Sequence, residues 1–465
     1  MFRFMTNQSN GNRREFLRVG SLALGGLSLP MLLQAKAAAA QTSSSITTGK
    51  SVIFLFLHGG PSQYETFDPK QTAPQEIRGV TGEINTSVPG LTFGSGFPNL
   101  ARRANKMAVV RSFVTERGSH DLKPLVDRNT TLNANMGSLF SRVVGPMRPD
   151  GMPTNAAIFP NAVDPESNGP IRNFGNFSSS GTLGASYAPF IPGAGGQLQQ
   201  NMTLNLPEDR LDDRRQLLTQ LDSLHRQVDA TGSIEAVDRF HEQAIDVILG
   251  GIADAFDITQ EDPRLIARYD TSHLLRSDRW QSWNNRNRYN SNAKNLGKLM
   301  LLARRLCERG AGFVTVSTDF VWDMHADRNN MGVRDGSELV GRPLDHALSA
   351  FFDDLEVRGL TDDILLVVCG EMGRTPRINN RGGRDHWGRI APLFLYGGGV
   401  GNGQVIGRSD RNGGEPASDP VRMNNLISTI MHTVLNVGQV RLMPNVPSDV
   451  LRVVTGSEPI PGTVV

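Results

Sequence analysis

Histidines next to carboxylates are the residues of this chain best suited to chemistry. Asp323 and His325 are two positions apart, and Asp385 directly precedes His386. Residues i and i+2 of an extended segment point to the same side, so Asp323 and His325 could reach one ion. A glycine-rich loop could turn the second pair inward as well. Because imidazole with carboxylate suits zinc, manganese or iron, and carboxylate alone suits calcium or magnesium, the two pairs indicate a candidate site for a divalent metal ion.

Further polar residues follow apolar runs that are typical of buried strands. His58 comes directly after the first run, and Glu371 follows a later one. Either side chain suits a metal ion, but His58 could equally bond to backbone, and Glu371 could be a solvated turn carboxylate. Ser112 and Thr115 stand after the second run, where a nucleophile would stand, although both residue types also form turns. Four of the nine histidines follow such runs, namely His58, His120, His325 and His386.

Five apolar runs predict the strands that position these side chains. They cover residues 51–57, 107–111, 312–318, 363–369 and 391–396. Helical periodicity separates them at 295–309 and 344–357, returns at 421–435, and covers two helices within 208–256. Strands alternating with helices predict an α/β sandwich with a mainly parallel central sheet flanked by helices. Ligands bind at the carboxyl ends of such strands, so we expect the polar residues to meet at one edge of the sheet.

Composition excludes several classes of protein and site. The 465 residues carry 48 basic and 46 acidic side chains, which leaves no net field for binding nucleic acid. Two cysteines exclude a disulfide framework and any cysteine-built zinc or iron–sulfur site. The first strand is followed by no G-x-G-x-x-G, which disfavours nucleotide binding, and no G-x-S-x-G elbow supports an α/β-hydrolase.

The first forty residues have the composition of an export signal. Arg13 and Arg14 precede Phe16 and Leu17, an apolar run covers residues 19–33, and small residues follow at 35–40. A basic region, a short apolar stretch and an A-x-A site are typical of a secretory signal, and the paired arginines resemble a twin-arginine (Tat) leader. An uncleaved anchor helix is the alternative. Residues 1–40 therefore predict export by the Tat machinery to the periplasm or beyond, with no transmembrane segment in the mature chain.

The remaining chain is expected to form one domain. Residues 41–465 hold all the predicted strands, and we interpret the glycine- and proline-rich stretch at about 145–200 as an inserted loop region. A helical region covers about 208–310. No internal repeat of 20–50 residues is present in the sequence.

Three further segments, together with the leader, carry a resemblance to a known family. They are FLHGGPSQYETFDPK at 56–70, FVTVSTDFVWDMH at 313–325 and GEMGRTPRINNRGGRDHWG at 370–388. In this order they resemble the exported bacterial family of domain of unknown function 1501, over nearly all of residues 50–461. That family is placed in the alkaline phosphatase and sulfatase superfamily, so the resemblance implies an alkaline-phosphatase-like sandwich.

The resemblance also implies a set of metal ligands. Carried over by position, the superfamily's ligands fall on Asp323, His325, Glu371 and His386, with Asp385 and His58 as further candidates. The aspartate that usually ends the first strand is absent, and His58 stands nearby. The sulfatase C-x-P-x-R signature is absent too, which disfavours a formylglycine sulfatase. The resemblance implies one or two divalent ions, with zinc, calcium, magnesium and manganese all open.

The function implied by the resemblance is metal-dependent hydrolysis of phosphate or sulfate esters outside the cytoplasm. Ser112 and Thr115 would form the nucleophile region, and Arg374 would grip the oxygens of the anion. The substrate would be an anionic small molecule or polysaccharide. The alternative is a non-catalytic envelope or glycan-binding protein that keeps the phosphatase-like fold, and the missing first-strand aspartate favours it.

Overall fold

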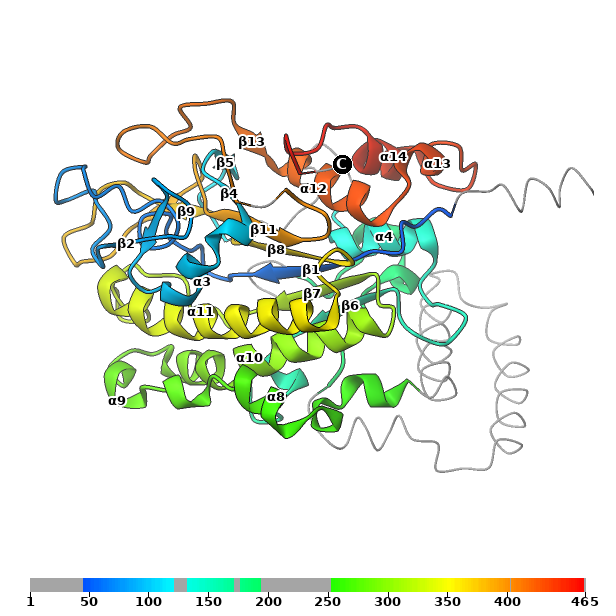
Figure 1. The fold of residues 1–465 in the computed structure, drawn as a ribbon, viewed down its shortest axis with the longest axis horizontal. Coiled ribbons are helices and arrows are strands. Elements are labelled where there is room, and N and C mark those ends of the chain that lie inside the picture. Colours follow the sequence, from blue (N-terminus) through cyan, green and yellow to red (C-terminus); the bar gives the residue numbers. More distant parts are fainter. Residues whose placement is uncertain (1–44, 121–131, 171–175, 194–251, 402, 464–465) are drawn as a thin grey trace, which may run out of the picture. The chain divides into compact units, whose positions relative to one another are not determined.

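A central sheet of seven strands organises the chain. The computed structural model describes residues 45–120, 132–170, 176–193, 252–401 and 403–463, and the predicted leader lies outside them. Within these residues the strand order is β12-β4-β11-β8-β1-β7-β6 (Figure 1). The strands are β1 (Ser51–Phe56), β4 (Met107–Val110), β6 (Asn155–Ile158), β7 (Phe313–Ser317), β8 (Ile364–Cys369), β11 (Leu393–Gly397) and β12 (Gln404–Ile406).

Six of these strands run in one direction. β1 pairs in parallel with β7 and β8, β6 with β7, and β12 with β4, whereas β11 is antiparallel to both β8 and β4. The carboxyl ends of β1, β4, β7 and β8 therefore share one edge of the sheet. Because β11 runs the other way, the loop that precedes it reaches the same edge. The mainly parallel sheet predicted from the sequence is confirmed.

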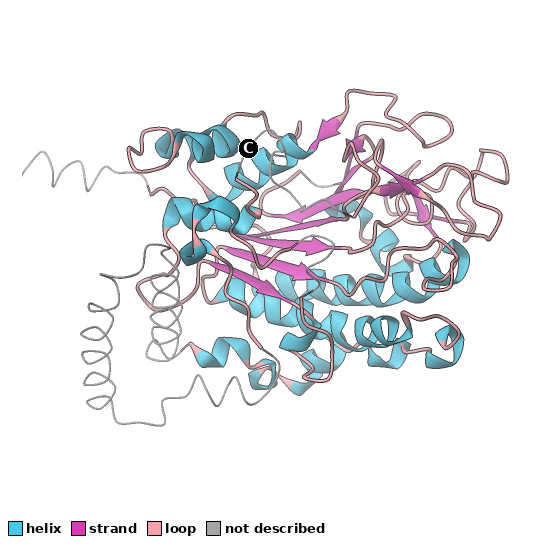
Figure 2. Ribbon diagram, turned by 180° about the vertical axis from the view of Figure 1, so that it is seen from behind, coloured by secondary structure: helices cyan, strands magenta, loops and turns pink. Residues whose placement is uncertain are grey.

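Helices cover both faces of the sheet (Figure 2). α10 (Arg286–Glu308) packs on β7 and β1 and against α11 (Val333–Arg358), so these two long helices form the layer on one face. α4 (Met136–Val144) and α12 (Met423–Val434) pack on the opposite face, and α14 (Ser448–Thr455) packs on α12. The shorter helices are α3 (Pro98–Arg102), α8 (Pro263–Tyr269), α9 (Ser277–Trp280) and α13 (Val437–Val440). No helix among the described residues is both long and apolar enough to cross a membrane.

The core strands form because both of their faces are covered. All six residues of β1 and all six of β8 are buried, which explains their continuous apolar runs, since a strand covered on both sides needs no alternation. All five predicted strands are present. β6 and β12 were not predicted. β6 lies inside the expected loop region and consists of four residues, two of them alanine, so it gave too weak a signal.

The helix boundaries differ from the predicted ones mainly at the amino ends. α11 begins at Val333 and not at 344, and it contains Pro343 in its interior. A proline usually ends a helix, which is why the sequence placed the start after it. The carboxyl end was predicted correctly, because Gly359 adopts the left-handed conformation (φ +69°) that only glycine adopts without strain.

A network of buried ions joins the two long helices. Arg304 of α10 contacts Asp354 of α11 at 3.0 Å and Glu261 at 2.9 Å, and its side chain is fully buried. Arg358 contacts the same two carboxylates at 2.8 Å each. Each buried charge thus has oppositely charged neighbours, as a buried ion requires.

Residues Thr47–Val465 form one compact unit. Within it the region at about 145–200 contributes β6, and the described part of the region at about 208–310 contributes α8, α9 and α10. The division into a leader and one domain with two insertions stays a prediction.

Candidate metal centre

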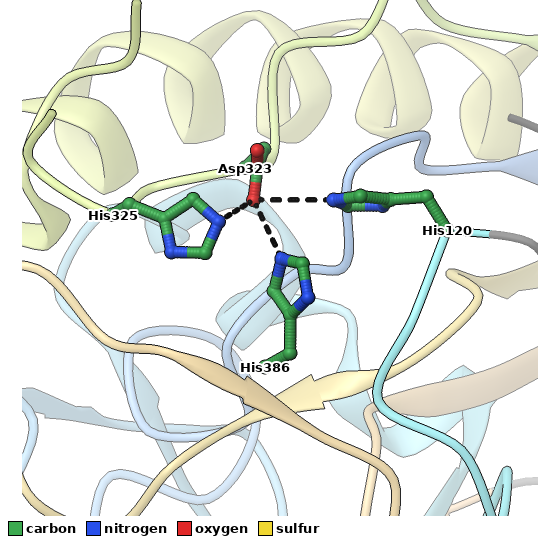
Figure 3. A group of neighbouring side chains, drawn as sticks. All are labelled: His120, Asp323, His325 and His386. Carbon is green, nitrogen blue, oxygen red and sulfur yellow. Dashed lines mark hydrogen bonds and ion pairs between the residues drawn. The ribbon is translucent and has the colours of Figure 1, made fainter. Parts of the chain in front are cut away.

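Four side chains from three separate segments of the chain converge at the carboxyl edge of the sheet. They are His120, Asp323, His325 and His386, and one ligand atom from each lies within 4.8 Å of all the others (Figure 3). His120 follows β4 and β5 (Phe113–Val114), Asp323 and His325 follow β7, and His386 precedes β11. The sheet therefore gathers residues that are 266 positions apart in the sequence between the first and last of them.

The loop after β7 is held by the turn that follows β1. The carbonyl of His58 accepts hydrogen bonds from the amides of Val321 (3.2 Å) and Trp322 (3.1 Å). Gly59 adopts φ +118°, and a Cβ there would lie 2.5 Å from the amide nitrogen of Asp323. Only glycine permits this close approach, so the Gly59-Gly60 turn sets the position of the Asp323 backbone.

His386 is placed by a short two-stranded ribbon. β10 (His386–Trp387) pairs antiparallel with β9 (Gly373–Arg374), which brings His386 opposite Arg374. The amide of Arg384 donates to the carbonyl of Met324 at 3.1 Å, which ties this ribbon to the loop that carries Asp323. The two segments with histidine and carboxylate pairs therefore lie side by side.

Asp323 is the centre of the cluster. Its Oδ1 lies 2.7 Å from Nε2 of His325, 3.2 Å from Nε2 of His386 and 3.5 Å from Nε2 of His120. The same oxygen accepts a hydrogen bond from Arg374 at 2.8 Å. Burial alone would raise the pKa of Asp323, but the hydrogen bonds from the three histidines and the charge of Arg374 hold it well below its ordinary value. The carboxylate is therefore ionised.

A buried carboxylate orients His120 from behind. Nδ1 of His120 lies 2.7 Å from Oε1 of Glu371, and the amide of Gly59 donates to the same oxygen at 3.0 Å. Burial lowers the pKa of His120, but the hydrogen bonds to Asp323 and Glu371 outweigh it and raise the pKa to about 9. Burial raises the pKa of Glu371, whereas His120 and the charge of His58 produce a net decrease. Nε2 of His120 therefore faces the cluster while Nδ1 is held by an anion.

The donor set suits a divalent transition metal ion. Three imidazole nitrogens and one carboxylate oxygen are the ligands that zinc, manganese and iron prefer. The three nitrogens face one oxygen from different sides (Figure 3), and an ion needs donors that converge in this way. The Glu371 contact is the carboxylate–histidine arrangement that commonly supports a metal-binding imidazole. The residues present therefore fit one ion.

The structure brings together three of the predicted ligands and leaves three outside the cluster. Asp323, His325 and His386 are in it. Glu371 contacts His120 instead, Asp385 is exposed with its Oδ1 3.8 Å from Nδ1 of His325, and His58 is buried against the rings of Phe56 and Phe320.

His120 is the cluster member that the sequence did not identify as a ligand. The available signal was its place among the four histidines that follow apolar runs. The carboxylate that orients it, Glu371, is 251 positions away in the sequence, so no local spacing could reveal the pair.

The two hydroxyls of the predicted nucleophile region have neighbours outside the cluster. Ser112 is fully buried, and its Oγ would meet a Cβ at Gly407. The Thr115 hydroxyl lies 3.4 Å from the carbonyls of Arg117 and Gly388. Neither hydroxyl has a hydrogen bond to a cluster residue, so the structure offers no support for either as nucleophile.

Arg374 lies beside the cluster but is not open to a ligand. Its side chain is fully buried, and Nε donates to the carbonyl of Gly60 at 2.7 Å. The terminal nitrogens donate to the carbonyls of Gly59, Trp322 and Arg384 and to Asp323. All three nitrogens are engaged, so the geometry favours a positioning role over the predicted grip on an anion.

One family model matches nearly the whole chain. The family is described as "Protein of unknown function (DUF1501)", and the match covers residues 49–459. No curated protein matches the sequence.

Solved structures resemble the chain only at low scores. The lipoteichoic acid synthase LtaP from Listeria monocytogenes gives a TM-score of 0.34 at 11% identity, covering 92% of this chain and 80% of that one. The PsFucS1 sulfatase from Pseudoalteromonas sp. gives 0.32 at 11%, with 91% and 72% covered. The alkaline phosphatase of the Antarctic bacterium TAB5 gives 0.29 at 12%, with 78% and 95% covered. Likeness at this level does not transfer an activity to the chain.

Proposed function

The chain belongs to the DUF1501 family, and from this premise we propose that it is an exported, metal-dependent hydrolase of phosphate or sulfate esters. The observation that supports the proposal is the convergence of His120, Asp323, His325 and His386 on one point at the carboxyl edge of a parallel sheet. This edge is where α/β proteins place their active sites. The sequence resemblance described above supplies the expectation of ester hydrolysis.

His120, Asp323, His325 and His386 would hold the ion. When bound, a divalent ion of this kind supplies a Lewis acid and lowers the pKa of water. Arg374 fixes the carboxylate of Asp323 at 2.8 Å, and Glu371 fixes the ring of His120 at 2.7 Å. These two contacts orient one ligand from each of two different loops.

Protons at the site are controlled by the same residues. The pKa of His120 is raised to about 9 in the metal-free protein, so both ring nitrogens carry a proton at neutral pH. Binding of an ion at Nε2 would require loss of the proton on that nitrogen. Among the described residues no serine or threonine hydroxyl contacts the cluster, so the proposal takes water as the nucleophile. Ser112 and Thr115 have no part in it.

Metal content and esterase activity of the full chain test the proposal together. The protein is produced with its leader, recovered after export, and analysed for bound metal before and after dialysis against chelator. Asp323→Ala and His386→Ala are expected to lose the ion and all ester hydrolysis across phosphomonoesters, phosphodiesters and sulfate esters. The matched control is His432→Ala, since His432 is a half-buried histidine on α12 outside the cluster. A folded wild-type protein that binds no ion would overturn the proposal.

The enclosure of Arg374 favours a second candidate, a binding protein that keeps the fold without the chemistry. An enzyme that cleaves anionic esters needs donors for the transferred group, and Arg374 would have to leave four carbonyls and Asp323 to provide them. A protein that holds one ion per chain yet turns over no ester in the panel would support this candidate.

The proposed export is tested separately. A variant with Arg13→Lys and Arg14→Lys keeps the charge of the leader but removes the arginine pair. We expect it to accumulate in the cytoplasm, whereas the wild-type protein is recovered from the periplasmic or secreted fraction. Equal distribution of the two proteins would contradict Tat-dependent export.

A further inference from the structure

A polar cavity lies beside α11, and none of the four candidate metal ligands lines it. Its volume is about 570 Å³, within the range of about 300–1,000 Å³ that is usual for ligand sites. We propose that it binds an uncharged, polyhydroxylated ligand of the sugar class. The residues that line it are Thr81, Ser95, Gly96, Pro98, Asn99, Leu274, Arg334, Asp335, Glu338, Arg342, Asp345 and His346.

One wall is a row of side chains spaced four residues apart along α11. Arg334, Glu338, Arg342 and His346 follow one another at this spacing, which places them on one face of the helix. Arg342 pairs with Glu338 at 2.9 Å. The row therefore presents the carboxylate of Glu338 between two guanidinium donors, with the imidazole of His346 at its end.

Neighbouring charges of the wall also compensate each other. Asp335 pairs with Arg279 of α9 at 3.2 Å. Burial and the nearby charge of His273 lower the pKa of His346, so its ring is neutral near neutral pH. The lining thus sets two arginines against three carboxylates, Asp335, Glu338 and Asp345, and has no excess of positive charge. A phosphate or sulfate group would meet carboxylates as well as arginines.

The opposite wall is fixed by a buried carboxylate. Asp345 accepts hydrogen bonds from the amides of Asn99 (3.0 Å) and Leu100 (2.7 Å) and from the side-chain amide of Asn99 (2.8 Å). These bonds hold the first turn of α3 against α11. Gly96 faces the helix as well, since a Cβ there would lie 3.5 Å from the carbonyl of Ser337. The cavity is therefore preformed, which reduces the entropy cost of binding.

Two buried polar atoms of the lining residues have no hydrogen-bond partner within the described part of the chain. They are Oγ1 of Thr81 and Nε2 of His346, one on each wall. A buried polar atom without a partner costs free energy, so either side chain would gain by turning toward a ligand hydroxyl in the cavity.

Sugar hydroxyls match this lining better than other small-molecule groups do. Each hydroxyl donates one hydrogen bond and accepts up to two, so a row of them can donate to Glu338 and accept from Arg334 or Arg342. Pro98 and Leu274 are the apolar side chains of the lining. They offer too little apolar surface to bind a hydrophobic ligand.

The site does not depend on the proposed metal centre. The face of α11 that carries Gly336 and Ser337 packs on Met324, with Oγ of Ser337 3.4 Å from Sδ of Met324. The row that lines the cavity lies on another face of the same helix. Sugar binding is therefore expected to survive chelation of metal and the Asp323→Ala substitution, so the two proposals can fail separately.

Saturation-transfer NMR on the full chain, with glucose, N-acetylglucosamine and maltose as probes and inorganic phosphate and sulfate as competitors, tests the inference. Ser95→Trp fills the cavity from an exposed position, and Asn85→Trp, at an exposed position outside the lining, is its matched control. Thr81→Val keeps the size of the side chain and removes only the hydroxyl. We expect at least one sugar to bind the wild-type protein, with affinity reduced at least tenfold by Ser95→Trp, severalfold by Thr81→Val and not at all by Asn85→Trp.

Three results would overturn the inference. The first is no saturation transfer from any of the sugars. The second is sugar binding that neither Ser95→Trp nor Thr81→Val weakens. The third is displacement of the sugar by millimolar phosphate or sulfate, because it would make the site an anion site.

Discussion

Two arginines of this chain are fully buried yet differ in what surrounds them. Arg304, between α10 and α11, faces carboxylates, namely Asp354 at 3.0 Å and Glu261 at 2.9 Å. Arg374, under the metal cluster, faces mainly backbone carbonyls, and Asp323 is the carboxylate it contacts. Around Arg304, arginines and carboxylates pair with one another. Around Arg374, the one carboxylate, Asp323, is shared between this arginine and three histidines.

The difference separates a structural network from a site. Asp354 accepts from Arg304, Arg358 and the hydroxyl of Tyr269, so three of the roughly four acceptor positions of its carboxylate are filled. Asp323 shares Oδ1 among three imidazoles and one guanidinium. Imidazoles can exchange a proton for a metal ion, but guanidinium groups cannot. The buried pair of Arg304 and Asp354 therefore supports the stability of the fold, whereas the pair of Arg374 and Asp323 lies where histidines can take up a metal ion.

Removing Arg304 is expected to give the largest effect on stability. Arg304→Met removes the fully buried cation beside Asp354 and Glu261 and leaves them the more exposed Arg358, which costs about 3–5 kcal/mol of unfolding free energy. Denaturant unfolding of the metal-free protein measures it. Arg279→Met is the control, since its pair with Asp335 is exposed, and a change within about 1 kcal/mol is expected. We expect the folded Arg304→Met protein to bind as much metal as the wild type. A loss of metal would show that the network around Arg304 is not purely structural.

Removing Arg374 is expected to affect both stability and metal binding. Arg374→Met leaves the carbonyls of Gly60 and Arg384 without their donor and frees Asp323 to move. We expect about 3 kcal/mol of destabilisation from the unpaired buried groups and a loss of metal affinity in the protein that remains folded. Unfolding curves and metal titrations on the same preparations measure the two effects. Destabilisation with unchanged metal affinity would make Arg374 a structural residue like Arg304.

Asp319 differs from Asp354 and Asp323 because it is a buried carboxylate without a buried arginine beside it. Burial raises the pKa of Asp319 to about 6, and Ser291, Arg288 and Asn168 offset it only in part. The folded protein therefore binds this proton more tightly than the unfolded chain does. Its contribution to stability is complete below about pH 4 and is lost as the pH rises to about 6, a loss of up to about 3 kcal/mol.

Asp319→Asn is expected to remove this pH dependence. Unfolding free energies of the metal-free proteins at pH 4.5, 5.5 and 7 should diverge, with the variant the more stable one at pH 7. Asp362→Asn, at an exposed carboxylate, serves as the control. If the wild type and Asp319→Asn lose stability in parallel across this range, Asp319 does not titrate as inferred.

Much of the fold could be predicted from the sequence, because the core strands are apolar on both faces. The run at 51–57 has no other stable location than the middle of a sheet, and the polar residues after each strand indicated the edge where ligands bind. β6 escaped prediction because two of its four residues are alanines, and the true start of α11 was hidden by Pro343.

The site was predictable only where its members were close in sequence. Asp323 and His325 are two positions apart, and His386 stands beside a carboxylate, so each was visible as a pair. His120 depends on Glu371, a partner 251 positions away. The enclosure of Arg374 depends on carbonyl oxygens, which no sequence pattern marks.

The smallest expected effect comes from Glu371. The question is whether this buried carboxylate binds the metal ion itself or orients His120, which would bind it. In the structure it contacts His120 at 2.7 Å and receives the amide of Gly59. Glu371→Gln keeps the size and one acceptor oxygen but removes the charge that holds Nδ1 of His120. We expect the metal affinity to fall about 10–100-fold, the usual effect of losing such a supporting carboxylate, with little change in unfolding free energy. Competition with a chromophoric chelator measures the affinity.

The control and the reference variant make this result decisive. Glu83→Gln, at an exposed glutamate of β2 (Glu83–Asn85), is expected to bind metal as the wild type does. Asp323→Ala is expected to lose binding altogether. If Glu371→Gln loses the ion as completely as Asp323→Ala, Glu371 is itself a ligand, as the sequence resemblance implied. If its affinity equals that of Glu83→Gln, the contact with His120 does not contribute to binding. An intermediate loss, with the His120 ring resonances shifted in the metal-free NMR spectrum, identifies Glu371 as the residue that orients His120.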